Sequence, residues 1–433
     1  MEVAAGAVAF EAATTTLEGG AIAGYAIAQK TMPLRATFTQ IATSPQTPDR
    51  SSLCRLGHTV SVVDGKAYIF GGTTTGAICT NEMHILTLPP KSSETGAQYK
   101  CIPALSVEHQ KEVPPSRCYH SATVYGEVIL VYGGRDDDGQ SLKEGSKLWK
   151  FSTKSLQWSC LQYAEDEEGD GYAVYGHGAT IQDDQLVIYG GVRNTPSEDQ
   201  YRSPTLMTLG LKVFTKRVAK LAIEPATCFP ANLVAVDDAV YTINGDDELS
   251  TNVRQINLEA AMASSPAALG EERGFREIPI PSNPLTPGPK GPRDGAALVP
   301  ISTGHGRHYL IYMFGMAPAQ AVLHANSATP AKNSQTSSFC SDAWTLQIPS
   351  SDMSLSSAKD KARDALGMDS GRWSWSEVEI KTNTGETEHE GKVHPGPRAF
   401  AAYAAIDDRR ILVWGGQDAT HDAVGDGWII RFE

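Results

Sequence analysis

The sequence lacks a long apolar run. No stretch of about 18 uninterrupted apolar residues occurs, and Glu11, Glu18 and Gln29 break up the apolar N-terminus. Glu2 and Glu11 also stand where a secretory signal would carry Lys or Arg. The sequence therefore predicts neither a membrane span nor an export signal, and we expect a cytoplasmic protein.

Clustered positive charge is also missing. The chain has 50 Asp and Glu against 37 Lys and Arg, which gives a formal net charge of −13. Nucleic acids and anionic membranes bind clustered basic residues, so neither is an expected partner. The sequence has no P-loop and no H-E-x-x-H, and no G-x-G-x-x-G follows a strand to open a helix. Chemistry that depends on a nucleotide is therefore not predicted.

The cysteines form no recognisable framework. They are odd in number and widely scattered, with no C-x-x-C pair and no metal-ligand spacing. This pattern favours a reducing compartment, and we expect neither a cofactor nor a bound metal. The seven are Cys54, Cys79, Cys101, Cys118, Cys160, Cys228 and Cys340.

What the chain does contain is a repeat built on a strand that ends in paired glycines. A residue without Cβ adopts positive φ easily, so such a pair suits a strand end where the chain passes close to its neighbour. Two degenerate copies make six units, with Asn244 and Met316 each read as replacing one glycine. The copies are residues 68–72, 131–134, 188–191 and 413–416, and the degenerate ones 241–245 and 312–316.

Further strands flank each glycine strand. A short strand that often begins with Arg precedes it, a third strand that often contains Trp follows, and several units show a fourth. Four strands in roughly 50 residues are typical of a propeller blade. The pattern R-x-G-H-S, then G-G, then a tryptophan strand resembles the kelch repeat over about residues 35–433. The resemblance implies an all-β, six-bladed kelch β-propeller, similar to stand-alone fungal kelch proteins.

The sixth unit ends at Glu433, directly after its third strand. Residues 35–41 form an unassigned alternating strand before unit one, and adding it to blade six would remove an exposed sheet edge. We therefore expect an N-terminal strand to close the ring. The Ala-rich residues 1–34 are expected to form short helices packed on the ring, and residues 35–433 the propeller.

The four arginines that open the first strands are candidate site residues. The resemblance places them near the mouth of the central channel, where guanidinium groups bind anions or carbonyl groups. The alternative is that they brace neighbouring blades, because kelch repeats keep this arginine in proteins of unrelated function. They are Arg55, Arg117, Arg293 and Arg398.

Four aromatic residues stand beside the expected channel. Tyr119 replaces the glycine of the repeat, and Tyr175 opens the strand that lacks Arg. Phe229 and Phe400 take the corresponding place in blades four and six. Together they predict an apolar pocket with a few polar anchors, with packing in the core as the alternative.

Acidic and imidazole side chains complete the candidates. Carboxylates after the glycine strands include Asp246 and Asp418, and they suit acid–base chemistry if buried or solvated turns if exposed. His58, His120 and His177 recur at one repeat position, which indicates a structural role.

From these residues we expect a cofactor-free enzyme that binds a small, largely apolar metabolite in the channel mouth and catalyses a cyclisation or isomerisation. The fungal resemblance implies natural-product biosynthesis. The alternative is a kelch platform that binds a protein partner through its loop face. In the enzyme hypothesis the catalytic residues are Arg117, Arg398, Tyr119 and Asp246, and the substrate-binding residues are Arg55, Arg293, Tyr175, Phe229, Phe400 and Asp418.

Two metal-dependent kelch families serve as comparisons. Galactose oxidase uses two tyrosines and two histidines for copper, and beyond the Tyr119–His120 pair nothing here fixes such ligands. Plant nitrile-specifier proteins carry an iron-binding E-x-x-x-D-x-x-x-H, which Glu386, Glu390 and His394 match with Glu in place of Asp. Carboxylate and imidazole suit iron, so an iron-dependent lyase is a second alternative.

Overall fold

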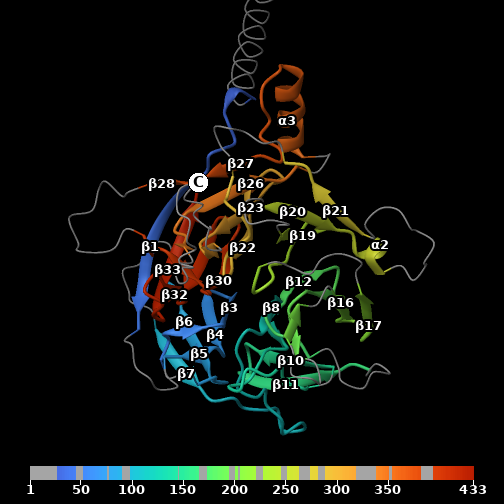
Figure 1. The fold of residues 1–433 in the computed structure, drawn as a ribbon, viewed down its shortest axis with the longest axis vertical. Helices are drawn as coiled ribbons and strands as arrows, with labels where there is room; N and C mark the ends of the chain where they lie inside the picture. Colours follow the sequence, from blue (N-terminus) through green and yellow to red (C-terminus); the bar gives the residue numbers. More distant parts are fainter. Residues whose placement is uncertain are drawn as a thin grey trace, which may run out of the picture.

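The computed structural model describes residues 27–44, 52–75, 78–89, 98–144, 146–164, 173–194, 200–202, 205–220, 228–244, 251–262, 274–280, 288–317, 338–350, 354–381 and 394–433. Within them, six sheets of four or five strands stand around a central axis (Figure 1). Their first strands contact one another in chain order, and the sixth contacts the first. The predicted six-bladed, all-β propeller is confirmed.

The strands of each blade are given from the axis outward. Blade one contains β3 (Thr59–Val63), β4 (Lys66–Phe70), β6 (Met83–Thr87) and β7 (Tyr99–Ile102). Blade two contains β8 (Ser121–Tyr125), β9 (Val128–Tyr132), β10 (Lys147–Ser152) and β11 (Gln157–Gln162). Blade three contains β12 (Gly178–Gln182), β13 (Gln185–Tyr189), β16 (Thr205–Gly210) and β17 (Lys216–Lys220).

The second half of the ring follows the same plan. Blade four contains β18 (Val234–Val236), β19 (Ala239–Asn244), β20 (Asn252–Ile256) and β21 (Phe275–Ile278). Blade five contains β22 (Ala297–Gly304), β23 (Arg307–Met313), β26 (Ala343–Gln347) and β27 (Trp375–Glu377). Blade six contains β30 (Ala402–Asp407), β31 (Arg410–Trp414), β33 (Asp426–Phe432), β1 (Arg35–Thr43) and β28 (Glu379–Ile380).

Short strand pairs and two helices complete the described elements. The helices are α2 (Leu258–Met262) and α3 (Leu355–Ala365), and neither has the length and apolar character needed to cross a bilayer. The pairs are β2 (Arg55–Leu56) with β5 (Thr73–Thr74), β14 (Val192–Asn194) with β15 (Gln200–Arg202), β24 (Met316–Ala317) with β25 (Ser338–Phe339), and β29 (Arg398–Ala399) with β32 (Gln417–Asp418).

The core lies between blades. Second strands such as β9 and β13 are buried over nearly their whole length rather than at alternate positions. Both of their faces pack against neighbouring blades, and a strand covered on both faces reads as a continuous apolar run. One buried cluster accordingly joins Phe70 of blade one to Phe151 and Trp158 of blade two. The glycine-terminated strands are thus the central layer of each interblade core.

The glycine pairs adopt the left-handed backbone that their composition predicts. In blade two, φ is 61° at Gly133 and 109° at Gly134. In blade five the corresponding residues are Phe314, with φ 59°, and Gly315, with φ 88°. The expectation that Met316 replaces one glycine was therefore wrong: Phe314 takes the first position, and Met316 begins β24.

The N-terminal strand closes the ring as expected. β1 pairs antiparallel with β33, with Ala36 opposite Phe432 and Phe38 opposite Ile430. Ala36 and Phe38 are buried in a cluster shared by blades five and six. Residues 1–26 lie outside the described residues, so the helical segment expected over residues 1–34, and with it the domain boundary, remains a prediction.

Candidate functional site at the channel mouth

The four repeat arginines are buried inside their own blades. In three of them the guanidinium donates to the carbonyl oxygen at the first glycine-pair position and to both oxygens of one carboxylate. Arg117 bonds the Gly133 carbonyl at 2.9 Å and Glu144 at 2.8 Å through each nitrogen. Arg293 bonds Phe314 and Asp342, and Arg398 bonds Gly415 and Asp426, in the same manner.

The carboxylates also fix the tryptophans of the third strands. Asp426 accepts from the Trp428 indole at 2.7 Å, and Asp342 accepts from Trp344 at 2.6 Å. Burial alone would raise the pKa of Asp426, but the Arg398 guanidinium and the indole more than offset burial, so its pKa lies below the ordinary value. Each of these arginines is therefore committed to a charged, bidentate hydrogen-bond network within its blade.

Blade one uses a histidine in place of the tryptophan. Arg55 lies 2.7 Å from Nε2 of His84, and it also donates to the carbonyl oxygens of Ser52 and Gly71. Burial first, and then the Arg55 charge, lower the pKa of His84 to about 3. A neutral imidazole that accepts at Nε2 carries its proton on Nδ1, which lies 2.8 Å from the Tyr99 hydroxyl. All four predicted arginines therefore make their contacts within their own blades, and none of them lines the channel cavity.

A glycine and an aromatic residue alternate at one position around the channel mouth. The six residues run in blade order Gly57, Tyr119, Gly176, Phe229, Gly295 and Phe400. Backbone hydrogen bonds link them across blades: the nitrogen of Tyr119 donates to Gly57, that of Gly176 to Tyr119, and that of Gly295 to Phe229. Tyr119 and Phe400 hold φ of 53° and 56°, so they keep the glycine-like backbone of the repeat.

The alternation gives three large rings room in a small opening. A Cβ on Gly176 would lie 2.0 Å from the Phe229 ring. Tyr119 meets Phe229 with ring centroids 5.1 Å apart and Phe400 at 6.2 Å. Tyr175 also contacts Phe229, at 5.9 Å. The four aromatic residues predicted at the mouth do come together, but they pack on one another.

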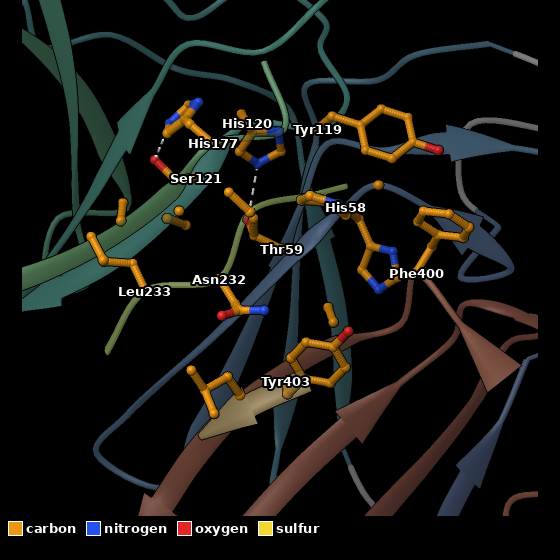
Figure 2. A pocket seen from close by; sticks show the side chains of 18 of the residues that line it. His58, Thr59, Tyr119, His120, Ser121, His177, Asn232, Leu233, Phe400 and Tyr403 are labelled. Carbon is orange, nitrogen blue, oxygen red and sulfur yellow. Dashed lines mark hydrogen bonds between the residues drawn. The ribbon is translucent and has the colours of Figure 1, made fainter. Parts of the chain in front are cut away.

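Beneath these rings the channel contains a cavity of about 200 Å³. First strands of several blades line it, and Tyr119 and Phe400 lie at one side with Asn232 and Tyr403 at the other (Figure 2). An engineered apolar cavity of about 150 Å³ accommodates benzene. The channel cavity therefore fits a ligand of about single-ring size.

Three neutral histidines form part of the cavity wall. Nε2 of His120 lies 2.9 Å from the Thr59 hydroxyl, and Nε2 of His177 lies 2.8 Å from the Ser121 hydroxyl (Figure 2). His58 differs because Ala402 takes the place of the hydroxyl residue in blade six. Its nitrogens make no well-formed hydrogen bond, and the Trp414 backbone is only a weak contact. Burial lowers the pKa of His177 to about 3 and that of His120 well below 6.5.

Arg135 is the mouth residue that sequence reasoning missed. It directly follows the glycine pair of blade two, and its guanidinium carbon lies 4.8 Å from the Tyr119 ring centroid and 5.4 Å from that of Tyr175. It forms no ion pair with a carboxylate of any residue that the structure describes. Its position directly after Gly133–Gly134 was the available signal, but only carboxylates were considered at such positions.

The predicted acidic residues are either turn residues or undescribed. Asp418 accepts hydrogen bonds from the backbone nitrogens of Thr420 and Asp422, as a solvated turn aspartate does. Asp246 lies outside the described residues.

Of the three residues predicted to bind iron, the structure describes only His394, because Glu386 and Glu390 lie outside the described residues. His394 contacts Phe38, and its Nδ1 accepts from the Gly396 nitrogen. Among the residues that the structure describes, no group of three His, Cys, Asp or Glu side chains is placed to hold a metal ion.

Comparisons with known proteins agree on the fold. The KLHDC2/KLHL20/DRC7 Kelch-repeats domain model matches residues 57–259. The solved structure of YjhT superposes with a TM-score of 0.53 at 14% identity, over 90% of this chain and 100% of that one.

Curated relatives are similar over shorter segments. A probable serine/threonine-protein kinase of Dictyostelium discoideum is 26% identical over 147 residues, which are 34% of this chain and 10% of that protein. Tip elongation aberrant protein 3 of Schizosaccharomyces pombe is 29% identical over 123 residues, 24% of this chain and 10% of that protein. Beta-scruin of Limulus polyphemus is 21% identical over 143 residues, 33% of this chain and 14% of that protein. Residues 57–259 thus match a kelch-repeat family model, and the described chain closes as a six-bladed β-propeller with the kelch arginine at the start of four blades.

Proposed function

We propose that this propeller is a protein-interaction platform whose partner presents a carboxylate to Arg135 at the channel mouth. The observation that carries this proposal is the contrast between Arg135 and the repeat arginines. Arg117, Arg293 and Arg398 each hold a bidentate carboxylate, whereas Arg135 has none among the described residues. A guanidinium without a carboxylate is an anchor for one from a partner.

The surroundings of Arg135 support this assignment. The rings of Tyr119 and Tyr175 lie against the guanidinium and limit its movement. Arginine and tyrosine are among the residues that contribute most to protein interfaces. Because the chain carries a net charge of −13, such a cation is also a distinctive feature for a partner to recognise.

The proposal is tested by selecting peptides from a random display library on the purified propeller. Selected peptides are expected to be enriched in Asp and Glu, and Arg135→Gln should weaken the best of them about tenfold or more, since a hydrogen bond to a charged group contributes about 1.5–3 kcal/mol. Arg276→Gln, at an exposed position on β21, is the matched control and should leave affinity unchanged. Acidic peptides that bind Arg135→Gln as tightly as the parent would overturn the proposal.

A cofactor-free enzyme acting on a small apolar molecule is the second candidate. The cavity lined by neutral imidazoles, with His58 short of a hydrogen-bond partner, favours it. The cavity volume limits this candidate to a single-ring ligand or to the ring portion of a larger one. The roles assigned to Arg117, Arg398, Tyr119 and Asp246, and a cyclisation or isomerisation, belong to this candidate.

Phenol is a suitable probe for the cavity, since its ring matches the volume and its hydroxyl can bond an imidazole nitrogen. If the channel accepts small molecules, phenol should raise the melting temperature of the parent protein, because ligands that bind only the folded state stabilise it. Ala402→Phe would place a ring in the cavity wall and should remove the shift. No shift in the parent protein would count against this candidate while leaving the interaction platform untouched.

A further inference from the structure

Two cysteines from different blades meet beside the channel mouth. Cys79 follows the glycine pair of blade one, and Cys118 opens blade two. A β-bridge pairs Thr80 with Arg117, which puts Cys79 and Cys118 on facing segments one residue further along. Each is only 2% exposed, and residues opposite each other in an antiparallel pair have their side chains on the same face.

The groups around this pair favour a thiolate at Cys118. The Cys79 thiol, the Thr73 hydroxyl and the Arg135 guanidinium all hydrogen-bond Cys118. The Cys79 bond contributes most, and together these contacts outweigh burial and lower the pKa of Cys118 to about 6. Asp137 acts on the Cys79 side of the pair, since its Oδ1 accepts from the Cys79 backbone nitrogen at 2.5 Å and its carboxylate helps to raise the pKa of the Cys79 thiol. A neighbouring cation favours the thiolate, and a second thiol can resolve a sulfenic acid, as at redox-active cysteines.

We propose that Cys79 and Cys118 form a redox-modification site that hydrogen peroxide converts to an interblade disulfide. The disulfide can be tested apart from the proposed partner binding, because peptide mapping follows only the two sulfurs, although Arg135 belongs to both sites. Cys54 and Cys228 differ from this pair, because burial raises the pKa of each of these two buried thiols.

The chemistry balances with peroxide as the oxidant. The Cys118 thiolate attacks one peroxide oxygen, the O–O bond breaks, and hydroxide leaves, so that Cys118 becomes a sulfenic acid. The Cys79 sulfur then attacks the Cys118 sulfur, the S–O bond breaks, and the departing hydroxide takes the Cys79 proton to form water. Two thiols are oxidised by two electrons in total, and one peroxide is reduced to two waters. A thiol reductant reverses the change.

Oxidation is expected to alter the mouth as well. The disulfide would join the loop of blade one to the first segment of blade two, and it would remove the thiolate that Arg135 contacts. Arg135 would then lose a charged neighbour while keeping Tyr119 and Tyr175.

Peptide mapping of the native protein tests the site directly. Trypsin places Cys79 alone in the peptide 67–91 and Cys118 alone in 118–135. Peroxide treatment of the folded parent protein should link these two peptides, with the loss of two free thiols, and the link should disappear on reduction. The reaction of Cys118 with peroxide should remain fast down to about pH 6. Cys101 is an exposed residue, but partial burial of its thiol raises the pKa, so its reaction should slow sharply over the same pH range.

Variants separate the two sulfurs. Cys79→Ser should leave a sulfenic acid at Cys118 that dimedone traps, Cys118→Ser should abolish both products, and Cys228→Ser should behave like the parent. If peroxide oxidises Cys101 in the folded parent while peptides 67–91 and 118–135 stay unlinked and unmodified, the proposal is overturned. That result needs no variant, so it holds even if a substitution prevents folding.

Discussion

Deletion of residues 1–43 is expected to destabilise the whole propeller rather than to trim a tail. The deletion removes β1, which supplies the antiparallel partner of β33 along nearly its full length. It also takes Leu34, Ala36 and Phe38 out of a core shared by blades five and six, where each large apolar side chain contributes about 1.5–3 kcal/mol. The edge left on β33 would expose unpaired backbone groups and favour aggregation.

Thermal unfolding of the parent protein and four variants measures this effect. Deletion of residues 1–26 keeps β1 and is the control for the loss of the N-terminus itself. Within β1, Phe38→Asp places a charge on the buried face, whereas Thr39→Asp places the same charge on the exposed face one residue away. Phe38→Asp should lower the melting temperature strongly and Thr39→Asp little. Equal melting temperatures for the parent and the deletion of residues 1–43 would show that β1 is dispensable.

The closed ring was predictable because its signals are local. Paired glycines mark the end of the second strand in four of the six blades, with a backbone conformation that few other residues adopt readily. In the sequence, residues 35–41 form an alternating strand that belongs to no repeat unit, and the sixth unit has no fourth strand. The structure pairs the two, β1 with β33. The misplacement of Met316 has a local cause too, because Phe314 holds a positive φ that sequence composition does not predict for an aromatic residue.

The roles of the arginines were harder to predict because their partners are distant in sequence. Arg398 pairs with a carboxylate 28 residues later, and Arg293 with one 49 residues later. A usable signal was nevertheless present: Asp342 and Asp426 each stand two residues before a tryptophan of the third strand. A buried carboxylate beside an indole donor calls for a cation, and the repeat arginine supplies it.

The mouth shows the opposite case. The aromatic substitutions at glycine positions correctly predicted that Tyr119, Phe229 and Phe400 meet, since equivalent positions converge on the axis. Their contacts with one another, and the place of Arg135 between two tyrosine rings, depend on side-chain packing between blades. No spacing within one repeat encodes such packing, so it became visible only in three dimensions.

Lowering the pH from 6.5 toward 5 is expected to destabilise the propeller through its buried histidines. Burial lowers the pKa values of His58, His84 and His177 to about 3, from an ordinary value of 6.5. These imidazoles stay neutral in the folded chain and take up protons only when it unfolds, so their contribution to stability is complete above pH 6.5 and declines as the pH falls toward 3. Each costs about 1.4 kcal/mol per pH unit in that window.

Denaturant midpoints measured between pH 7 and pH 4 test this expectation. The pKa values of Asp342 and Asp426 lie below the ordinary 3.8, so their contribution to stability is lost only at lower pH. A decline in stability that begins near pH 6.5 therefore identifies the histidines. His177→Gln keeps a hydrogen-bonding group for the Ser121 hydroxyl but cannot be protonated, and it should flatten the pH dependence by about one proton. His109→Gln, at an exposed position, is the matched control and should reproduce the parent slope. A His177→Gln profile as steep as that of the parent would mean that His177 is not held neutral by the fold.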